Sequence, residues 1–123
     1  MFGRVIRGAA HRVDLSGLLT ELLRRSTVLG TDNQATAQTG KLLAQPSAGK
    51  RLVLTGLLLS TDTAMNIRLI EAGEDVVPRV YFPAPGSGNI LFPGGLQMGL
   101  NHGLQYTSSV DGNHSVAAYG WEE

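Results

Sequence analysis

The chain has 123 residues, 42% hydrophobic and 16% charged, which is enough for one domain with a modest core and too apolar for a disordered protein. Ten Lys and Arg balance ten Asp and Glu, and zero net charge argues against a dedicated nucleic-acid binder, whose affinity comes mainly from neutralising phosphates. No cysteine is present, which excludes a disulfide framework and a thiolate metal site. Sixteen glycines and five prolines predict an all-β domain of many short strands.

The start of the chain is basic and then leucine-rich. Residues 1–13 show no settled periodicity and predict an arm that becomes ordered on contact, with Arg4, Arg7 and Arg12 as its charges. From Asp14 onward leucines recur at spacings of three and four, which predicts a short amphipathic helix. Its apolar stripe consists of Leu15, Leu18, Leu19, Leu22 and Leu23. Such a short helix is marginal alone, so the stripe needs cover from the β-domain, a second copy or another protein.

Neither a secretory signal nor a membrane span is expected. The apolar residues after the first arginines are interrupted by Thr20 and Glu21, and no apolar run approaches the length that crosses a bilayer. We therefore expect synthesis in the cytoplasm of a host cell. Residues 26–40 are small and polar and are expected to form a linker. The expected organisation is an arm, helix and linker over residues 1–40 and a β-sandwich over residues 41–123.

Seven or eight short strands are expected in the β-domain, separated by turn signals at regular intervals. They are Lys41–Gln45, Lys50–Ser60, Ala64–Glu71, Val77–Phe82, Asn89–Phe92, Leu96–Leu100, Leu104–Val110 and His114–Trp121. The last two are expected to pair as a hairpin around Asp111-Gly112-Asn113. This pattern is typical of a small antiparallel β-sandwich or jelly roll.

The strand at Lys50–Ser60 is apolar on both faces. Strict alternation places Leu52, Leu54 and Leu58 on one face. The other face then holds Val53, Leu57 and Leu59, and these three residues are the predicted subunit interface. A sheet without a polar face indicates that its outer side is covered, either by the N-terminal helix or by a neighbouring subunit.

The stretch from Gly49 to Trp121 resembles the compact jelly-roll domain of tailed-bacteriophage virion proteins, which include capsid decoration (cement) proteins, head fibres and some fibre tips. The resemblance is carried by Gly49-Lys50-Arg51, Leu52–Ser60, Ala64–Ala72 with Gly73, Ile90–Pro93, Leu96–Leu100, Asn101-His102-Gly103 and Leu104–Trp121. Leu96 departs from the family, which often has Trp or Phe at that point. The resemblance implies a homotrimer about a threefold axis, and it does not cover the first 40 residues.

Residue patterns of known catalytic and metal sites are missing from the sequence. His11, His102 and His114 have no metal-ligand spacing, and we expect them on the surface or in turns. Gly49-Lys50 does not complete a P-loop, and no serine lies in Gly-x-Ser-x-Gly. The sequence therefore predicts no catalytic residue, no cofactor and no metal, and we expect that the protein is not an enzyme.

The favoured interpretation is a phage capsid decoration protein on the virion surface, a trimer that binds the major capsid protein or another virion protein and stabilises the shell. Arg4, Arg7, Arg12 and the five leucines of the helix would form its anchor. The alternative is a receptor- or glycan-binding module of a fibre or tail, with recognition by the loops Pro83–Gly88 and Asn101–Gly103 or by Tyr119 and Trp121. A cellular jelly roll with a small-molecule pocket is a third, weaker possibility.

Overall fold

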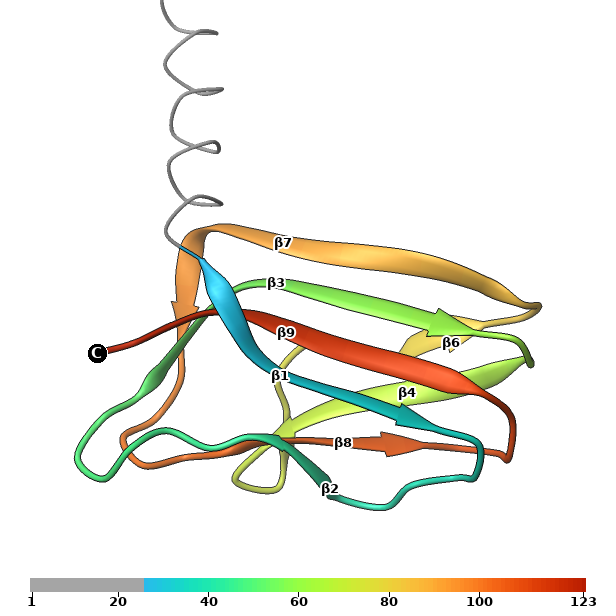
Figure 1. Ribbon diagram of the computed structural model, residues 1–123, viewed down its shortest axis with the longest axis horizontal. Helices are drawn as coiled ribbons and strands as arrows, with labels where there is room; N and C mark the ends of the chain where they lie inside the picture. Colours follow the sequence, from blue (N-terminus) through green and yellow to red (C-terminus); the bar gives the residue numbers. More distant parts are fainter. Residues whose placement is uncertain (1–25) are drawn as a thin grey trace, which may run out of the picture.

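A computed structural model describes residues 26–123, which form two packed antiparallel sheets (Figure 1). The strands are β1 (Thr27–Gln34), β2 (Lys41–Ala44), β3 (Leu52–Thr61), β4 (Met65–Glu71), β5 (Glu74–Asp75), β6 (Val80–Phe82), β7 (Gly86–Gln97), β8 (Leu104–Ser108) and β9 (His114–Glu122). The first sheet has the order β1-β9-β3-β7, and the second has the order β2-β8-β4 with β5 and β6 both paired to β4.

The connections between strands define a jelly roll. Apart from the step from β4 through the short β5 to β6, each successive strand lies in the sheet opposite the one before it. This interleaving of two antiparallel sheets is the jelly-roll arrangement of two Greek keys. The predicted all-β class and the small jelly-roll architecture are therefore confirmed.

The core lies between the two sheets and is almost entirely aliphatic. On β4, Met65, Ile67 and Leu69 point inward and are at most 2% exposed, as their alternation with polar residues predicts. From the opposite sheet, Leu52 and Leu54 of β3 meet them in the same buried cluster. Each fully buried aliphatic side chain of this size contributes about 1.5–3 kcal/mol relative to an exposed one, so this layer supplies much of the drive for folding.

The linker predicted over residues 26–40 is wrong at Thr27–Gln34, which form the edge strand β1 and pair with β9. The segment is polar because only part of each face is buried, and its one inward acid, Asp32, accepts a hydrogen bond from Tyr106 Oη at 2.6 Å. At Gly30 the edge of β1 meets β2 so closely that a Cβ would overlap the Leu43 carbonyl oxygen. The sandwich is thus closed on its β1–β2 side, and the β-domain starts before residue 41.

Two other strand predictions need correction. The chain bends at Asp111-Gly112, but β8 and β9 belong to different sheets and do not form a hairpin. Asn89–Phe92 and only the first two residues of the strand expected at Leu96–Leu100 are parts of one strand, β7, which pairs with β3 on both sides of an irregularity and ends at Gln97. In both cases pairing with distant strands outweighs the local turn signal.

The predicted arm and the leucine-striped helix lie outside the described residues. Within residues 26–123, no helix has the length and apolar character needed to cross a membrane.

Candidate interaction surface

A β-bulge in β3 decides which of its leucines can reach a partner. Leu54 and Gly56 pair with the consecutive residues Gly120 and Tyr119 of β9, so Thr55 is an extra residue in β3. The register against β7 shifts at the same point. An extra residue inverts the alternation of every residue that follows. Leu52 and Leu54 before the bulge, and Leu57 and Leu59 after it, therefore all face the core.

Because of this bulge, the predicted subunit interface of Val53, Leu57 and Leu59 is wrong. Leu57 is 0% and Leu59 is 2% exposed, and both belong to the core cluster of the chain itself. Val53 does point outward, but it is only 3% exposed, because Gly95 lies over it. A Cβ built on Gly95 would be 2.8 Å from Val53 Cγ1. None of the three offers surface to a neighbour, whereas Leu58, assigned to the same face as Leu52, is 44% exposed.

The surface that does remain open is the outer face of the first sheet, which we define by three cross-strand rows. The first row is Val28, Tyr119, Gly56 and Leu91; the second is Thr31, Ala117, Leu58 and Asn89; the third is Asn33, Ser115, Ser60 and Ser87. None of these residues is charged. The face changes from apolar in the first row to hydroxyl and amide side chains in the third, so its two ends suit different partners.

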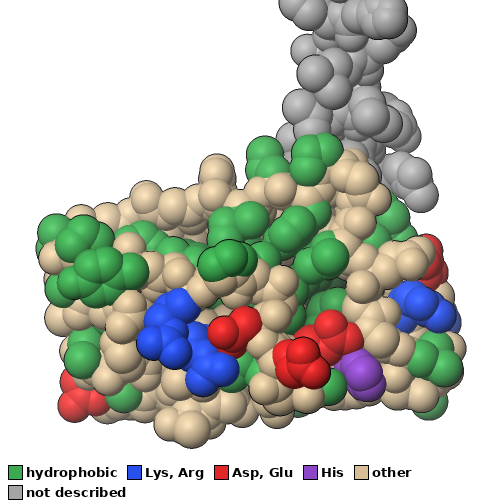
Figure 2. Space-filling view, turned by 180° about the vertical axis from the view of Figure 1, so that it is seen from behind, with side chains coloured by type: hydrophobic (Ala, Val, Ile, Leu, Met, Phe, Trp, Pro, Cys, Tyr) green, Lys and Arg blue, Asp and Glu red, His purple; other side chains and the backbone are tan. Residues whose placement is uncertain are grey.

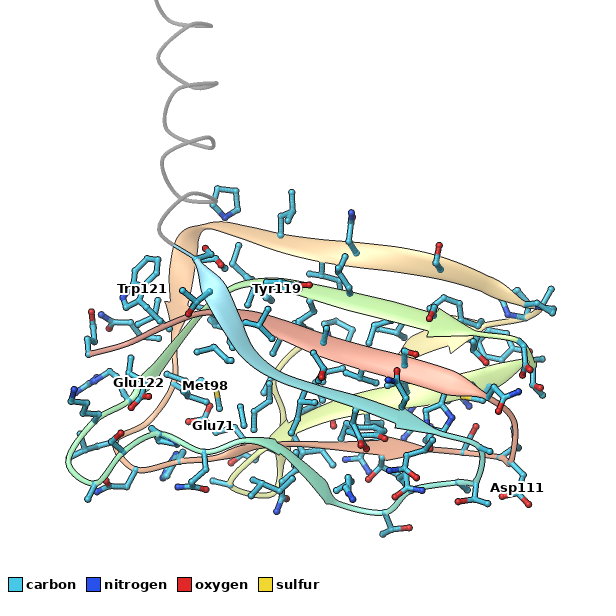
Figure 3. The ribbon with its side chains drawn as sticks, viewed as in Figure 1. Glu71, Met98, Asp111, Tyr119, Trp121 and Glu122 are labelled. Atoms are coloured by element: carbon cyan, nitrogen blue, oxygen red, sulfur yellow. The ribbon has the colours of Figure 1, made fainter. Side chains whose placement is uncertain are left out.

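The first row is an apolar strip that crosses all four strands of the sheet. Its outer residues are well exposed, with Val28 at 54% and Leu91 at 49%. Leu91 leans over Gly56, since a Cβ on that glycine would lie 3.4 Å from Leu91 Cδ2. Tyr119 and Trp121 share this face of β9 and are both half-buried. Figure 3 shows them near the start of β1. Exposed apolar residues gathered in one strip are typical of an interaction surface.

The described chain begins beside this strip. Ser26 Oγ and Thr55 Oγ1 are 2.6 Å apart and share a hydrogen bond, which ties the entry of the chain to the bulge in β3. The eight predicted anchor residues, Arg4, Arg7, Arg12, Leu15, Leu18, Leu19, Leu22 and Leu23, all precede this point and lie outside the described residues.

The two loops proposed for receptor recognition do not come together. Pro83 to Gly88 connect β6 to β7 at one end of the sandwich, while Asn101 to Gly103 precede β8 at the other end (Figure 1). Three of the first segment's residues, Gly86 to Gly88, belong to β7 itself. The side chain of Asn101 is engaged within the chain, because its Oδ1 accepts a hydrogen bond from Gly49 N at 2.6 Å. A single binding site built from both loops is therefore excluded.

A polar depression at one end of the sandwich is lined by Asn33, Gln34, Ala35, Ser60, Thr61, Asp62, Asn113, His114 and Ser115. The carboxylate of Asp62, the one acid in this lining, accepts hydrogen bonds from Thr63 and Asn113. These hydrogen bonds keep the pKa of Asp62 below its usual range. His114 is only 3% exposed, contrary to the expected surface position. Its Nδ1 lies 2.8 Å from the Gly112 carbonyl oxygen, which makes Nδ1 the protonated nitrogen.

The other described histidine also has a structural role. His102 Nδ1 lies 2.8 Å from Glu71 Oε2, and the same carboxylate oxygen accepts a 2.5 Å hydrogen bond from Gly99 N. These contacts hold the loop after β7 against the end of β4. Among residues 26–123, no group of three His, Asp or Glu side chains is arranged to hold a metal ion.

The fold defines an antiparallel β-sandwich with jelly-roll topology, and comparison with known proteins adds little beyond that. No family model matches the sequence, and no curated protein matches it either.

Among solved structures, the nucleoplasmin-like N-terminal domain of Drosophila FKBP39 is 12% identical, with a TM-score of 0.44 over 78% of this chain and 89% of that one. A tobacco streak virus coat protein is 8% identical, with a TM-score of 0.42 over 77% and 83%. A dimer structure of the same coat protein gives 7% identity and the same TM-score, over 77% and 82% of the two chains.

Proposed function

We propose that this protein is a structural component of a phage virion that decorates the capsid as a trimer and stabilises the shell. The resemblance of Gly49–Trp121 to phage jelly-roll domains motivates the role, and the jelly-roll strand order is consistent with it. The observation that carries it is the uncharged outer face of the first sheet, with Val28, Leu58 and Leu91 each more than two-fifths exposed. Burying the exposed half of one such side chain contributes about 1 kcal/mol, so several together support attachment.

In this proposal the N-terminal segment anchors the domain beside the same surface. The chain enters at Ser26, next to Thr55 and the apolar row, so a segment that binds the shell would bring the outer face against it. The five leucines would supply apolar contact, and Arg4, Arg7 and Arg12 would meet acidic groups on the major capsid protein. The proposed role is structural and involves neither catalysis nor a cofactor.

The anchor is tested by comparing the full chain with a chain lacking residues 1–25 in co-sedimentation with empty shells of the phage that encodes it. The shortened chain should keep the β-type circular dichroism spectrum of the full chain and lose shell binding. Undiminished binding of a folded, shortened chain would exclude the anchor. The mass of the full chain in solution tests the trimer separately.

The outer face is tested with a matched pair of substitutions. Leu58→Lys places a charge in the second row of the face, where we expect at least a tenfold loss of shell binding because the charge must be desolvated. Leu42→Lys is the control, since Leu42 is 50% exposed on β2 of the other sheet. If the two substitutions weakened shell binding equally, the outer face would not be the shell-binding surface.

A second candidate, binding of a glycan by a fibre or tail module, is favoured by the position of Tyr119 and Trp121 on one open face. Aromatic side chains there could stack against a sugar ring. Binding to a glycan array that is lost in Tyr119→Ala and kept in Tyr81→Ala would support this candidate. Tyr81 is a suitable control because it is 63% exposed on β6, a strand of the second sheet.

A further inference from the structure

Strand β7 forms an open edge of the first sheet. In the described part of the chain it pairs with β3 alone, over Gly86–Leu91 and again at Leu96 and Gln97, and Figure 1 shows it along the border of the sheet. In an antiparallel ladder, alternate residues of an edge strand direct both backbone groups away from the partner. β7 therefore presents a row of amide donors and carbonyl acceptors that match another extended strand.

The other sheet edges carry features that discourage such pairing. The edge of β1 is met by β2, where Gly30 touches the Leu43 carbonyl. β2 begins with a lysine, β5 consists of Glu74 and Asp75, and β6 has only three residues, Val80–Phe82. Charged, short or covered edges are the usual protection against pairing with another chain.

Over residues 86–91 β7 lacks this protection, since its proline, Pro93, and its irregularity lie beyond that segment. The sequence contains no Asp, Glu, Lys or Arg between Arg79 and Asp111, a stretch that includes all of β7. In Figure 2 the charged side chains gather over the second sheet, whereas hydrophobic and uncharged groups line most of the length of β7. At the pairing segment the outward side chains are Ser87, Asn89 and Leu91, all exposed. Nothing in this segment would repel an identical segment.

We propose that β7 of a second copy of this chain pairs antiparallel with β7 through residues 86–91, about a twofold axis. Antiparallel pairing of a strand with itself is isologous, so both copies use the same surface and the contact closes. It suits a segment that is uncharged, because like charges opposite each other would oppose it. The two first sheets become one continuous sheet.

This contact goes beyond the proposed shell binding and is compatible with it. Pairing through strand edges leaves the outer face unobstructed and places the two faces side by side. It doubles whatever assembly the chain otherwise forms: a monomer becomes a dimer, and a trimer becomes a pair of trimers. Failure of the pairing would leave the shell-binding proposal intact, and failure of shell binding would leave the pairing intact.

The test introduces charges at the edge of the full chain. Ser87→Lys/Asn89→Lys places two lysines on exposed positions of β7, so the fold should be retained. We expect the dissociation constant of the doubling step, measured by analytical ultracentrifugation, to rise about tenfold, since like charges opposite each other on paired strands are destabilising. The Ser87→Glu/Asn89→Glu variant, measured by itself, should show the same loss of affinity in the doubling step. An equimolar mixture of the two variants should return to the affinity of the unaltered chain or exceed it.

Thr31→Lys is the matched control, because Thr31 is exposed on the same face at the opposite edge strand, β1; it should leave doubling unchanged. Hydrogen exchange of the unaltered chain should show protection of residues 86–91 that rises with concentration. Three results with the chain alone would overturn the proposal: no doubling up to about 1 mM, no weakening by the lysines, or no recovery on mixing. Protection of β7 that appears only when shells are added would assign the edge to a shell protein and would equally overturn it.

Discussion

Removing the Tyr106 hydroxyl should destabilise the sandwich measurably, because it links the two sheets. Tyr106 is 0% exposed on β8, and its Oη donates to Asp32 Oδ2 of β1 at 2.6 Å. Burial and this acceptor both raise the pKa of Tyr106, so the hydroxyl remains a donor. In Tyr106→Phe the ring keeps its packing and the carboxylate loses one donor.

The expected loss is about 1.5 kcal/mol, at the lower end of the range for hydrogen bonds to charged groups. The lower end applies because Asp32 is only partly buried and still accepts hydrogen bonds from Gln34 Nε2 at 3.0 and 3.2 Å. For a domain of this size the loss corresponds to a fall in Tm of about 6–12 °C. Thermal unfolding followed by circular dichroism at pH 7 measures it, with the exposed Tyr81→Phe as control.

The difference between the two chains should also depend on pH. Burial raises the pKa of Asp32, but the hydrogen bonds from Tyr106 and Gln34, together with the nearby charge of Lys41, hold it below its usual range. The stabilisation from ionised Asp32 is therefore complete above the unfolded-state pKa of about 3.9, and it is lost as the pH falls through the lower folded-state pKa. Tyr106→Phe and the unaltered chain should converge in stability below about pH 4. A pH-independent difference, or a fall in Tm no larger than that of Tyr81→Phe, would refute this account of the link.

Two further predictions test the architecture by chemical denaturation. Leu57→Ala should cost about 2–5 kcal/mol because it leaves a cavity in the core, whereas Leu58→Ala, on the open face, should cost less than about 1 kcal/mol; similar costs would contradict the bulge at β3. Gly30→Ala should cost about 1–3 kcal/mol because the new methyl group meets the Leu43 carbonyl. Gly88→Ala has open space around it and should change stability by no more than about 0.5 kcal/mol.

Local patterns in the sequence were sufficient for the architecture. The alternation of Met65, Ile67 and Leu69 with polar residues identifies a strand with one buried face, and the structure confirms it. Frequent turn signals, such as Asp111-Gly112-Asn113, divide the chain into short strands, and a chain of many short antiparallel strands has few ways to bury its apolar faces. The jelly roll could therefore be predicted, although the pairing partners of β8 and β9 could not.

The interaction surface depended on contacts between distant segments. Whether Leu57 or Leu58 points outward depends on one extra residue at Thr55, and that bulge is defined by the registers of β7 and β9, which lie 30 or more residues away. Because side chains alternate with a period of two, a single inserted residue exchanges the two faces of the strand. Composition and spacing determined that this protein is a small β-sandwich with surplus apolar residues. Only the tertiary structure decided which of those residues, and which strand edge, remain open to a partner.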